Sequence, residues 1–247
     1  MTPADSIRET HERGYCVLHS RFPEPLIAAA REAFWPILTA HIQSHEPNRG
    51  PNRYFLPLPF ARPCFAPEFF FDPDVLAVVR GVMDERIVAD QWGCDVPLWG
   101  SACQDVHVDF RRPLFAEAPD LLLPPFCLLV SFGLVPIARE NGPIEIAAGT
   151  HRLPRAEGFD AVASGAIALQ PVPLAAGDVL IRNPWVLHRG TPNTTHTPRA
   201  LATIRYVRRW YSDDSREAPS ISQAVWRSLS AGRQALLRFP VEQGTPG

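Results

Sequence analysis

The sequence changes its pattern at about residue 88, and this change limits the folds open to the chain more than any other feature. From there to about residue 210, short apolar or alternating runs are separated by Gly, Pro and Asn. Many short strands with turn residues between them are typical of an all-β sandwich, barrel or jelly roll. The expected strands span residues 87–92, 103–110, 126–135, 144–147, 166–172, 178–183, 186–188 and 201–210.

The N-terminal part is expected to be mainly helical. Residues 4–13 are predicted to form a short polar helix, with Asp5 or Ser6 as its cap. Apolar residues recur with helical spacing over 23–44 and 74–88, and Pro36 is placed to kink or split the helix over 23–44. Residues 15–18 are predicted to form a short strand, and the stretch 45–72, rich in Pro, Asn, Arg and Phe, a long irregular loop. We therefore expect one domain with three parts, namely a helical part over about 1–88, a β-core over about 88–210 and a C-terminal helix over about 220–239.

Composition excludes several classes of protein. A net charge of −2 gives no electrostatic case for a nucleic-acid partner. No apolar run approaches the length that spans a bilayer, and residues 1–14 are polar and charged, unlike a secretory signal. The five cysteines form no C-x-x-C pair, which favours reduced thiols and a cytoplasmic location over a disulfide framework or a zinc site.

Three residues have the types and spacing of metal ligands. His107 and Asp109 stand two apart in an expected strand, so their side chains share one face. His188 lies 79 residues after Asp109, beyond a turn and another strand. Two imidazoles and one carboxylate can bind one face of a non-haem Fe(II) and leave the other face open. A His-x-Asp triplet also arises by chance, and spacing alone leaves open whether His188 binds metal or caps a strand end.

Arg199, eleven residues after His188, supplies a possible partner for a carboxylate. An arginine can bind a carboxylate through two parallel hydrogen bonds, which together with the three ligands suggests an oxygenase with a keto-acid co-substrate. The alternative interpretation is a solvated charge in a Pro-rich turn.

Several segments resemble a known family. The run from Asn141 to His151 (NGPIEIAAGTH), the run Gly177-Asp178-Val179-Leu180 followed by His188-Arg189-Gly190, and the run Gly14-Tyr15-Cys16-Val17-Leu18 followed by a helix are similar to segments of the phytanoyl-CoA dioxygenase family. They come in the same order and cover nearly the whole chain. That family belongs to the Fe(II)- and 2-oxoglutarate-dependent oxygenases.

The resemblance implies a double-stranded β-helix, a jelly-roll or cupin-like fold, with the N-terminal helices packed outside. It implies that His107, Asp109 and His188 bind iron, that Arg199 holds the far carboxylate of 2-oxoglutarate, and that the cofactors are Fe(II), 2-oxoglutarate and O2. His151 is expected to be structural. Related halogenases have a small residue at the Asp109 position, so Asp109 argues against halogenation.

One departure from the family concerns the co-substrate. A hydroxyl-bearing residue often stands two positions after the distal histidine, whereas this chain has Gly190. Thr191 or another residue is then needed to complete the grip on 2-oxoglutarate.

The implied function is oxidation of an unactivated C–H bond of a small molecule, by hydroxylation or oxidative ring closure, in bacterial natural-product tailoring, with a glycosylated or cyclic metabolite as substrate. Two alternatives stay open: a non-redox metal-dependent enzyme of cupin type, and a binding protein that kept the fold. The expected substrate walls are residues 49–71, residues 110–125 and Trp185. Arg111 and Arg112 are interpreted as solvated, and Tyr54, Phe55, Phe60 and Phe65 either stack on a ring or pack in the core.

Overall fold

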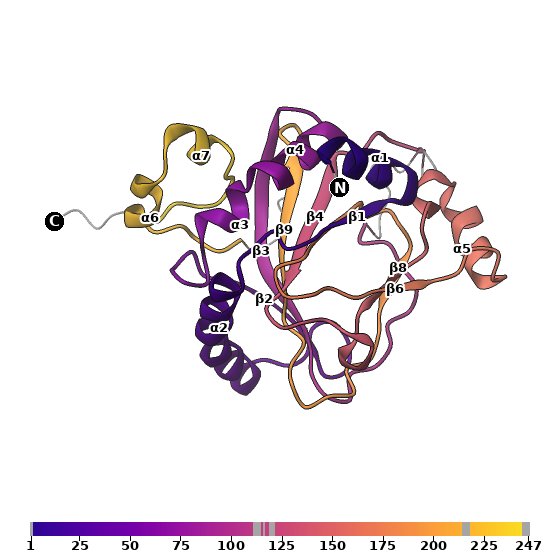
Figure 1. Ribbon diagram of the computed structural model, residues 1–247, viewed down its shortest axis with the longest axis horizontal. Helices are drawn as coiled ribbons and strands as arrows, with labels where there is room; N and C mark the ends of the chain where they lie inside the picture. The colour runs from indigo at the N-terminus through magenta and orange to yellow at the C-terminus, as the bar shows by residue number, and fades with distance from the viewer. Residues whose placement is uncertain (1, 111–114, 116, 119–121, 214–217, 244–247) are drawn as a thin grey trace.

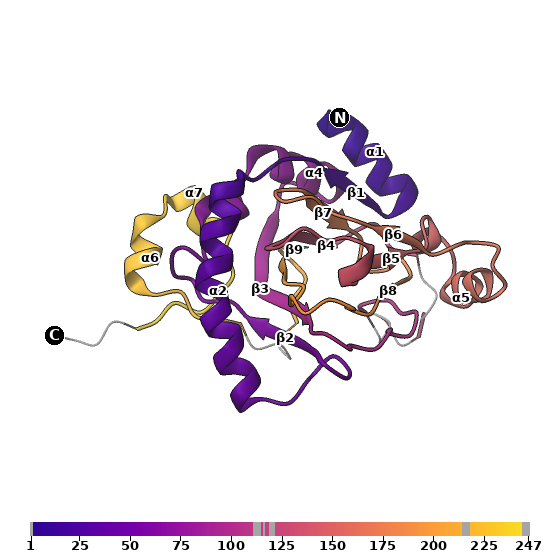
Figure 2. The same cartoon turned by 60° about the horizontal axis from the view of Figure 1, so that its bottom comes forward.

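The computed structural model describes residues 2–110, 115, 117–118, 122–213 and 218–243, and its centre is a pair of antiparallel sheets. A six-stranded sheet has the order β1-β7-β4-β9-β3-β2, and a three-stranded sheet the order β6-β5-β8. The two sheets face one another across a central space (Figure 2). The strands are β1 (Tyr15–Leu18), β2 (Arg53–Pro57), β3 (Ile87–Pro97), β4 (Cys127–Gly133), β5 (Ile144–Ile146), β6 (Gln170–Val172), β7 (Val179–Arg182), β8 (His188–Gly190) and β9 (Leu201–Arg208).

The helices lie outside this pair of sheets (Figure 1). They are α1 (Pro3–Arg13), α2 (Glu24–Ser44), α3 (Pro67–Phe71), α4 (Pro73–Val82), α5 (Arg155–Ala163), α6 (Gln223–Ser228) and α7 (Ala231–Ala235), with short 3-10 turns η1 (Arg139–Asn141) and η2 (Thr150–Arg152). The chain thus has the predicted jelly-roll fold with N-terminal helices packed outside. Pro36 is accommodated inside a single helix, α2.

Alternation along the strands separates the apolar core from the interior of the barrel. In β9, Ala202, Ile204 and Tyr206 pack into the large core beneath the helices. The intervening residues Thr203 and Arg205 line the space between the sheets. Because successive strand residues point to opposite faces, one strand supplies both an apolar surface and a polar cavity wall.

Several predicted elements differ from the structure. The helix expected over 74–88 ends at Val82, and the strand expected over 166–172 forms only at Gln170–Val172. The expected loop over 45–72 contains β2 and α3, because β2 pairs with β3. The expected strand over 103–110 is wrong: it makes one isolated bridge, His107 with His188. Gln104 N donates to Gly190 O, and His107 N donates to His188 O. Between these two bonds the chain advances three residues on the 103–110 side but only two on β8. This extra residue breaks the ladder.

The expected C-terminal helix over 220–239 is wrong as a single element. It is two short helices, α6 and α7, and between them Leu229 is extended and buried. Ser230 then caps α7 by accepting a hydrogen bond from the Arg233 N–H. A serine at this position starts a new helix, because its hydroxyl satisfies a free backbone N–H.

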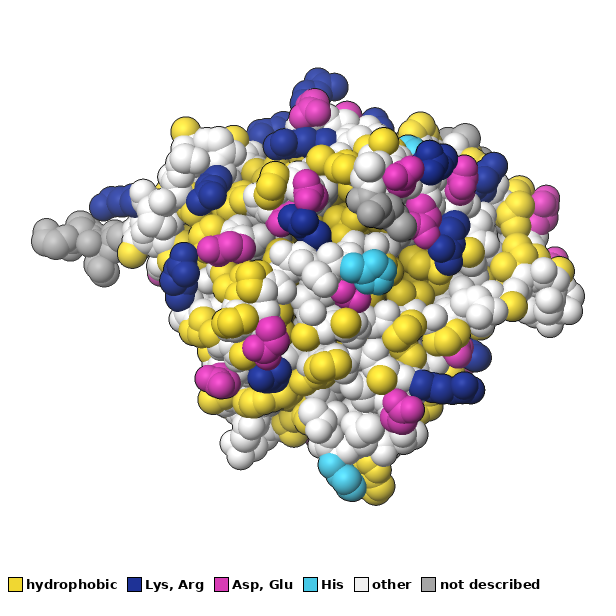
Figure 3. Space-filling model, in the orientation of Figure 1, with side chains coloured by type: hydrophobic (Ala, Val, Ile, Leu, Met, Phe, Trp, Pro, Cys, Tyr) yellow, Lys and Arg dark blue, Asp and Glu magenta, His cyan; other side chains and the backbone are white. Residues whose placement is uncertain are grey.

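The distribution of charge on the surface and the character of the helices are those expected from the low net charge and the short apolar runs of the sequence. On the face shown in Figure 3, acidic, basic and apolar side chains are interspersed, as the net charge of −2 suggests. Within the described residues, no helix is long and apolar enough to cross a membrane.

His151 is expected to make stability depend on pH. Its Nε2 donates to the His11 carbonyl at 3.1 Å, and its buried Nδ1 has no partner among the described residues. Burial lowers the pKa of His151 to about 4, against about 6.5 in an unfolded chain. As pH falls from about 6.5 to 4, the unfolded chain takes up the proton first, so the free energy of unfolding should fall by about 1–3 kcal/mol. Urea denaturation from pH 7 to 4 should show a shallower fall for His151→Gln, whereas equal falls would refute the assignment.

Candidate metal centre

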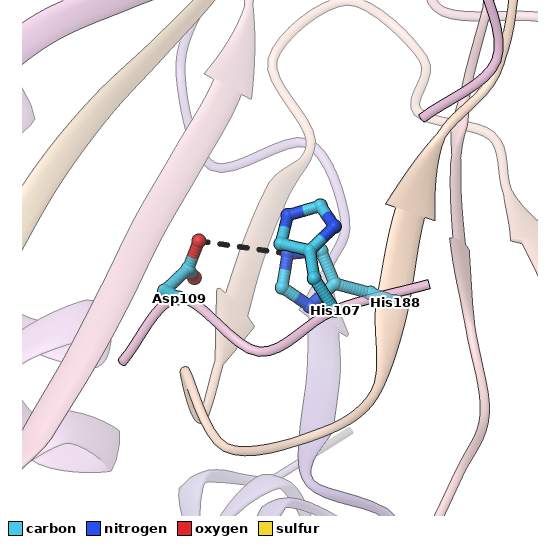
Figure 4. A group of neighbouring side chains, drawn as sticks. All are labelled: His107, Asp109 and His188. Carbon is cyan, nitrogen blue, oxygen red and sulfur yellow. Dashed lines mark ion pairs between the residues drawn. The ribbon is translucent and has the colours of Figure 1, made fainter. Parts of the chain in front are cut away.

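The three predicted ligands come together in the wall of the central cavity (Figure 4). His107 and Asp109 lie on the irregular segment beside β8, and His188 is the first residue of that strand. One ligand atom from each lies within 4.8 Å of the others. Asp109 Oδ1 is 3.6 Å from His188 Nε2, and the centres of the two imidazole rings are 4.4 Å apart. Atoms of these types at these distances could hold one cation.

Backbone carbonyls fix which nitrogen each histidine offers. His107 Nδ1 is 2.7 Å from the carbonyl of Asp105, and His188 Nδ1 is 2.9 Å from that of Val186. A carbonyl only accepts, so His107 Nδ1 carries the proton and its Nε2 keeps a free lone pair. His188 Nδ1 lies 3.2 Å from a donor, Arg182 Nη1, but nearer to the Val186 carbonyl, which favours the same tautomer. Metal-binding histidines are usually oriented by such a second hydrogen bond. Both rings therefore fit a metal ligand.

Charges around the centre keep the ligands in their metal-binding forms. Burial would raise the pKa of Asp109, but the Arg182 guanidinium outweighs it and holds that pKa well below its ordinary value. Burial, reinforced by Arg182, lowers the pKa of His188. Asp109 is thus ionised and His188 neutral near pH 7, which are the forms that bind a divalent metal.

Arg182 was not among the residues predicted from the sequence. It lies on β7, is buried, and donates from Nη2 to Asp109 Oδ2 at 2.7 Å. This bond leaves Oδ1 to face His188. The available signal was its position in a buried strand, where an arginine needs a charged partner.

Replacing Arg182 with methionine is expected to weaken metal binding about 10-fold to 100-fold, the usual effect of losing a partner of a metal ligand. The half-buried Asp109 carboxylate would lose the positive charge that keeps its pKa low. Calorimetric titration with Ni(II) measures the change, with Ser131→Ala in the same cavity as the control. Equal affinity for wild type and Arg182→Met would contradict this role.

Arg199 lines the same cavity as the three candidate ligands. Its side chain is 2% exposed, and its Nη2 donates to Asp95 Oδ2 at 3.2 Å. Its Nε and Nη1 are buried and have no partner among the described residues. A buried guanidinium with free N–H groups needs an acceptor, and a carboxylate in the cavity would provide one. The solvated-charge interpretation of Arg199 is therefore wrong.

The expected substrate walls divide between the cavity and the core. Phe55 and Phe110 line the cavity, whereas Tyr54, Phe60 and Phe65 are buried. Phe60 and Phe65 belong to the large apolar core.

Trp185 stacks flat on Phe110, with ring centres 4.3 Å apart, and so supports the wall from behind. Arg111 and Arg112 lie outside the described residues.

Comparisons with known proteins identify the family. The model of the phytanoyl-CoA dioxygenase family matches residues 10–201 of the 247 residues in the chain. Solved structures share the fold. EvdMO1 is 20% identical with a TM-score of 0.62, over 83% of this chain and 50% of that one. The present chain therefore spans half of the length of EvdMO1.

Two other structures match over most of their length. SnoK, described as a non-heme alpha ketoglutarate dependent carbocyclase from nogalamycin biosynthesis, is 16% identical with a TM-score of 0.64, over 84% of this chain and 86% of that one. HygX from Streptomyces hygroscopicus, solved with nickel, 2-oxoglutarate and hygromycin B, is 19% identical with a TM-score of 0.62, over 87% and 94%. With the family match covering most of its length, the chain belongs to the phytanoyl-CoA dioxygenase family and is a non-haem iron oxygenase that depends on Fe(II), 2-oxoglutarate and O2.

Proposed function

We propose that His107, Asp109 and His188 bind the iron, that Arg199 binds the far carboxylate of 2-oxoglutarate, and that the protein oxidises an unactivated C–H bond of a small molecule. The observation that carries this proposal is one cavity that holds three converging ligand atoms and a buried arginine with free N–H groups. The metal ligands and the carboxylate partner thus line one space.

Each residue has a distinct part in this chemistry. When bound, Fe(II) and 2-oxoglutarate supply the oxidant, with O2 reduced as 2-oxoglutarate loses CO2 to become succinate. The two histidines and Asp109 would hold the metal, and Arg199 would fix the orientation of the co-substrate by its far end. The stacked Phe110 and Trp185 form a rigid apolar wall beside Asp109 that excludes water and positions substrate.

The donor set favours an oxygenase over the cupin-type alternative. Among the described residues, the metal-binding group contains two histidines and one carboxylate. A non-redox cupin enzyme usually brings more histidines to the metal and needs no arginine at the Arg199 position. A binding protein without catalysis would have no need to retain all four residues.

For the substrate, we propose a bacterial natural product, glycosylated or cyclic, on which hydroxylation or oxidative ring closure takes place. Support comes from the aromatic cavity residues Phe55 and Phe110 and from the fold shared with SnoK and HygX. Oxygen-consumption screening against glycosylated and polycyclic metabolites would find such a substrate.

Succinate formation tests the proposed site before any substrate is known. Purified protein with Fe(II), ascorbate and 2-oxoglutarate under air should form succinate slowly. His107→Ala and Arg199→Ala should both abolish it, because one removes a metal ligand and the other the co-substrate partner. Succinate formation that persists in either variant would contradict the assignment of that residue.

A further inference from the structure

The space beside Gly190 is occupied by an arginine from a distant strand. A Cβ atom added at Gly190 would lie 2.3 Å from Arg53 Nη1 and 2.7 Å from Gln104 Oε1. The Gly190 N–H donates to the same Gln104 oxygen at 3.0 Å, which fixes the backbone there. A larger residue at position 190 would therefore have to displace the Arg53 guanidinium.

Thr191, the substitute suggested by the sequence, does not fill this role. Its hydroxyl donates to the Pro143 carbonyl at 2.7 Å and is thus used within the backbone of the neighbouring turn. Its own carbonyl accepts a hydrogen bond from Arg53 Nη2 at 2.8 Å. Thr191 therefore holds Arg53 in place rather than facing the cavity itself.

Arg53 and Arg199 share a single carboxylate. Arg53, on β2, is 2% exposed, and its Nη1 lies 3.3 Å from Asp95 Oδ2. Arg199 Nη2 approaches the same oxygen at 3.2 Å. Two guanidiniums and one carboxylate leave one positive charge, and all three residues line the cavity that contains the metal ligands. A buried net charge is unfavourable until an anion neutralises it.

We propose that Arg53 is a second binding residue for the far carboxylate of 2-oxoglutarate and that Gly190 is required to leave room for it. This inference rests on the proposed function of Arg199. Asp95 holds the two guanidiniums side by side and reduces their joint charge to +1, which one carboxylate neutralises. Arg53 thereby does the work of the hydroxyl group that is absent at position 190, with a full charge in place of a neutral donor.

A comparison of two ligands separates this role from a structural one. 2-Oxopentanoate has the same keto-acid end and chain length as 2-oxoglutarate but lacks the far carboxylate. Calorimetric titration of the Ni(II)-loaded protein gives both dissociation constants. The dissociation constant of 2-oxopentanoate divided by that of 2-oxoglutarate reports what the far carboxylate contributes to binding.

In Arg53→Met, this ratio should fall about 10-fold to 100-fold, as expected for the loss of a charged hydrogen bond. Gly190→Ala should lower it in the same direction by pushing Arg53 aside, which keeps the test open if Arg53→Met does not fold. Arg189→Met is the matched control, because Arg189 is on the same strand as Gly190 but pairs with Glu145 outside the cavity, and it should leave the ratio unchanged.

The outcomes are distinct. A ratio that stays at the wild-type value in both Arg53→Met and Gly190→Ala, with both ligands weakened equally, would overturn the proposal while leaving Arg199 in its role. Wild-type protein that fails to prefer 2-oxoglutarate over 2-oxopentanoate would overturn the proposed function as well.

Discussion

Asp109→Ala is expected to weaken binding of Fe(II) or Ni(II) at least about 100-fold and to abolish succinate formation. The change removes the single anionic ligand of the proposed centre. Losing a residue that only hydrogen-bonds to a ligand lowers metal affinity about 10-fold to 100-fold, and losing the ligand itself should lower it more. It also leaves the buried Arg182 guanidinium without its carboxylate. Because an unpaired buried charge is costly, we further expect a lower melting temperature.

Calorimetric titration with Ni(II) measures the affinity, and Asp105→Ala is the matched control. Asp105 is an exposed carboxylate two residues before His107, and only its backbone carbonyl contacts that ring. Asp105→Ala should bind metal as wild type does. Tight metal binding by folded Asp109→Ala would remove Asp109 from the centre.

Arg199→Met is expected to abolish most binding of 2-oxoglutarate and to leave metal binding within a few-fold of wild type. Methionine retains much of the buried volume but offers no N–H group to a carboxylate. Losing a buried charged hydrogen-bond partner costs about 2–4 kcal/mol, or roughly 30-fold to 1,000-fold in the dissociation constant. Separate titrations of metal and of 2-oxoglutarate distinguish the two effects.

Arg199→Lys provides an intermediate case. Lysine keeps the positive charge but has no planar pair of donors, so it should bind 2-oxoglutarate better than methionine and less well than arginine. Metal affinity that falls as far as 2-oxoglutarate affinity in Arg199→Met would indicate damage to the whole site, and would contradict a specific role for Arg199.

The three residues of the proposed metal centre could be singled out because local sequence carries their signal, and the structure brings them together. His107 and Asp109 stand two apart, and His188 follows a recognisable turn and strand. Helices α2 and α4 likewise follow from apolar spacing within single segments, whereas α3 lay in the stretch expected to be a loop. The strand expected over 103–110 failed, because its pairing with β8 is broken by an extra residue that no periodicity reveals.

The residues that support the site could not be predicted, because their roles depend on contacts between distant segments. Arg53 lay in a stretch expected to be a loop. It meets Asp95 when β2 pairs with β3, and it meets Gly190 because β8 of the other sheet lies beside it. The role of Arg182 depends on its hydrogen bond to Asp109, which is 73 residues away along the chain. Such pairings are set by how the two sheets close on each other rather than by composition or spacing.

The most direct test of the account is a titration of wild-type protein with 2-oxoglutarate under argon, with and without Fe(II). If His107, Asp109, His188 and Arg199 form one site, 2-oxoglutarate should bind at one equivalent when Fe(II) is present and far more weakly without it, because the metal holds the keto-acid end and Arg199 the other. Binding of equal strength with and without the metal, or no binding in either case, would contradict the account.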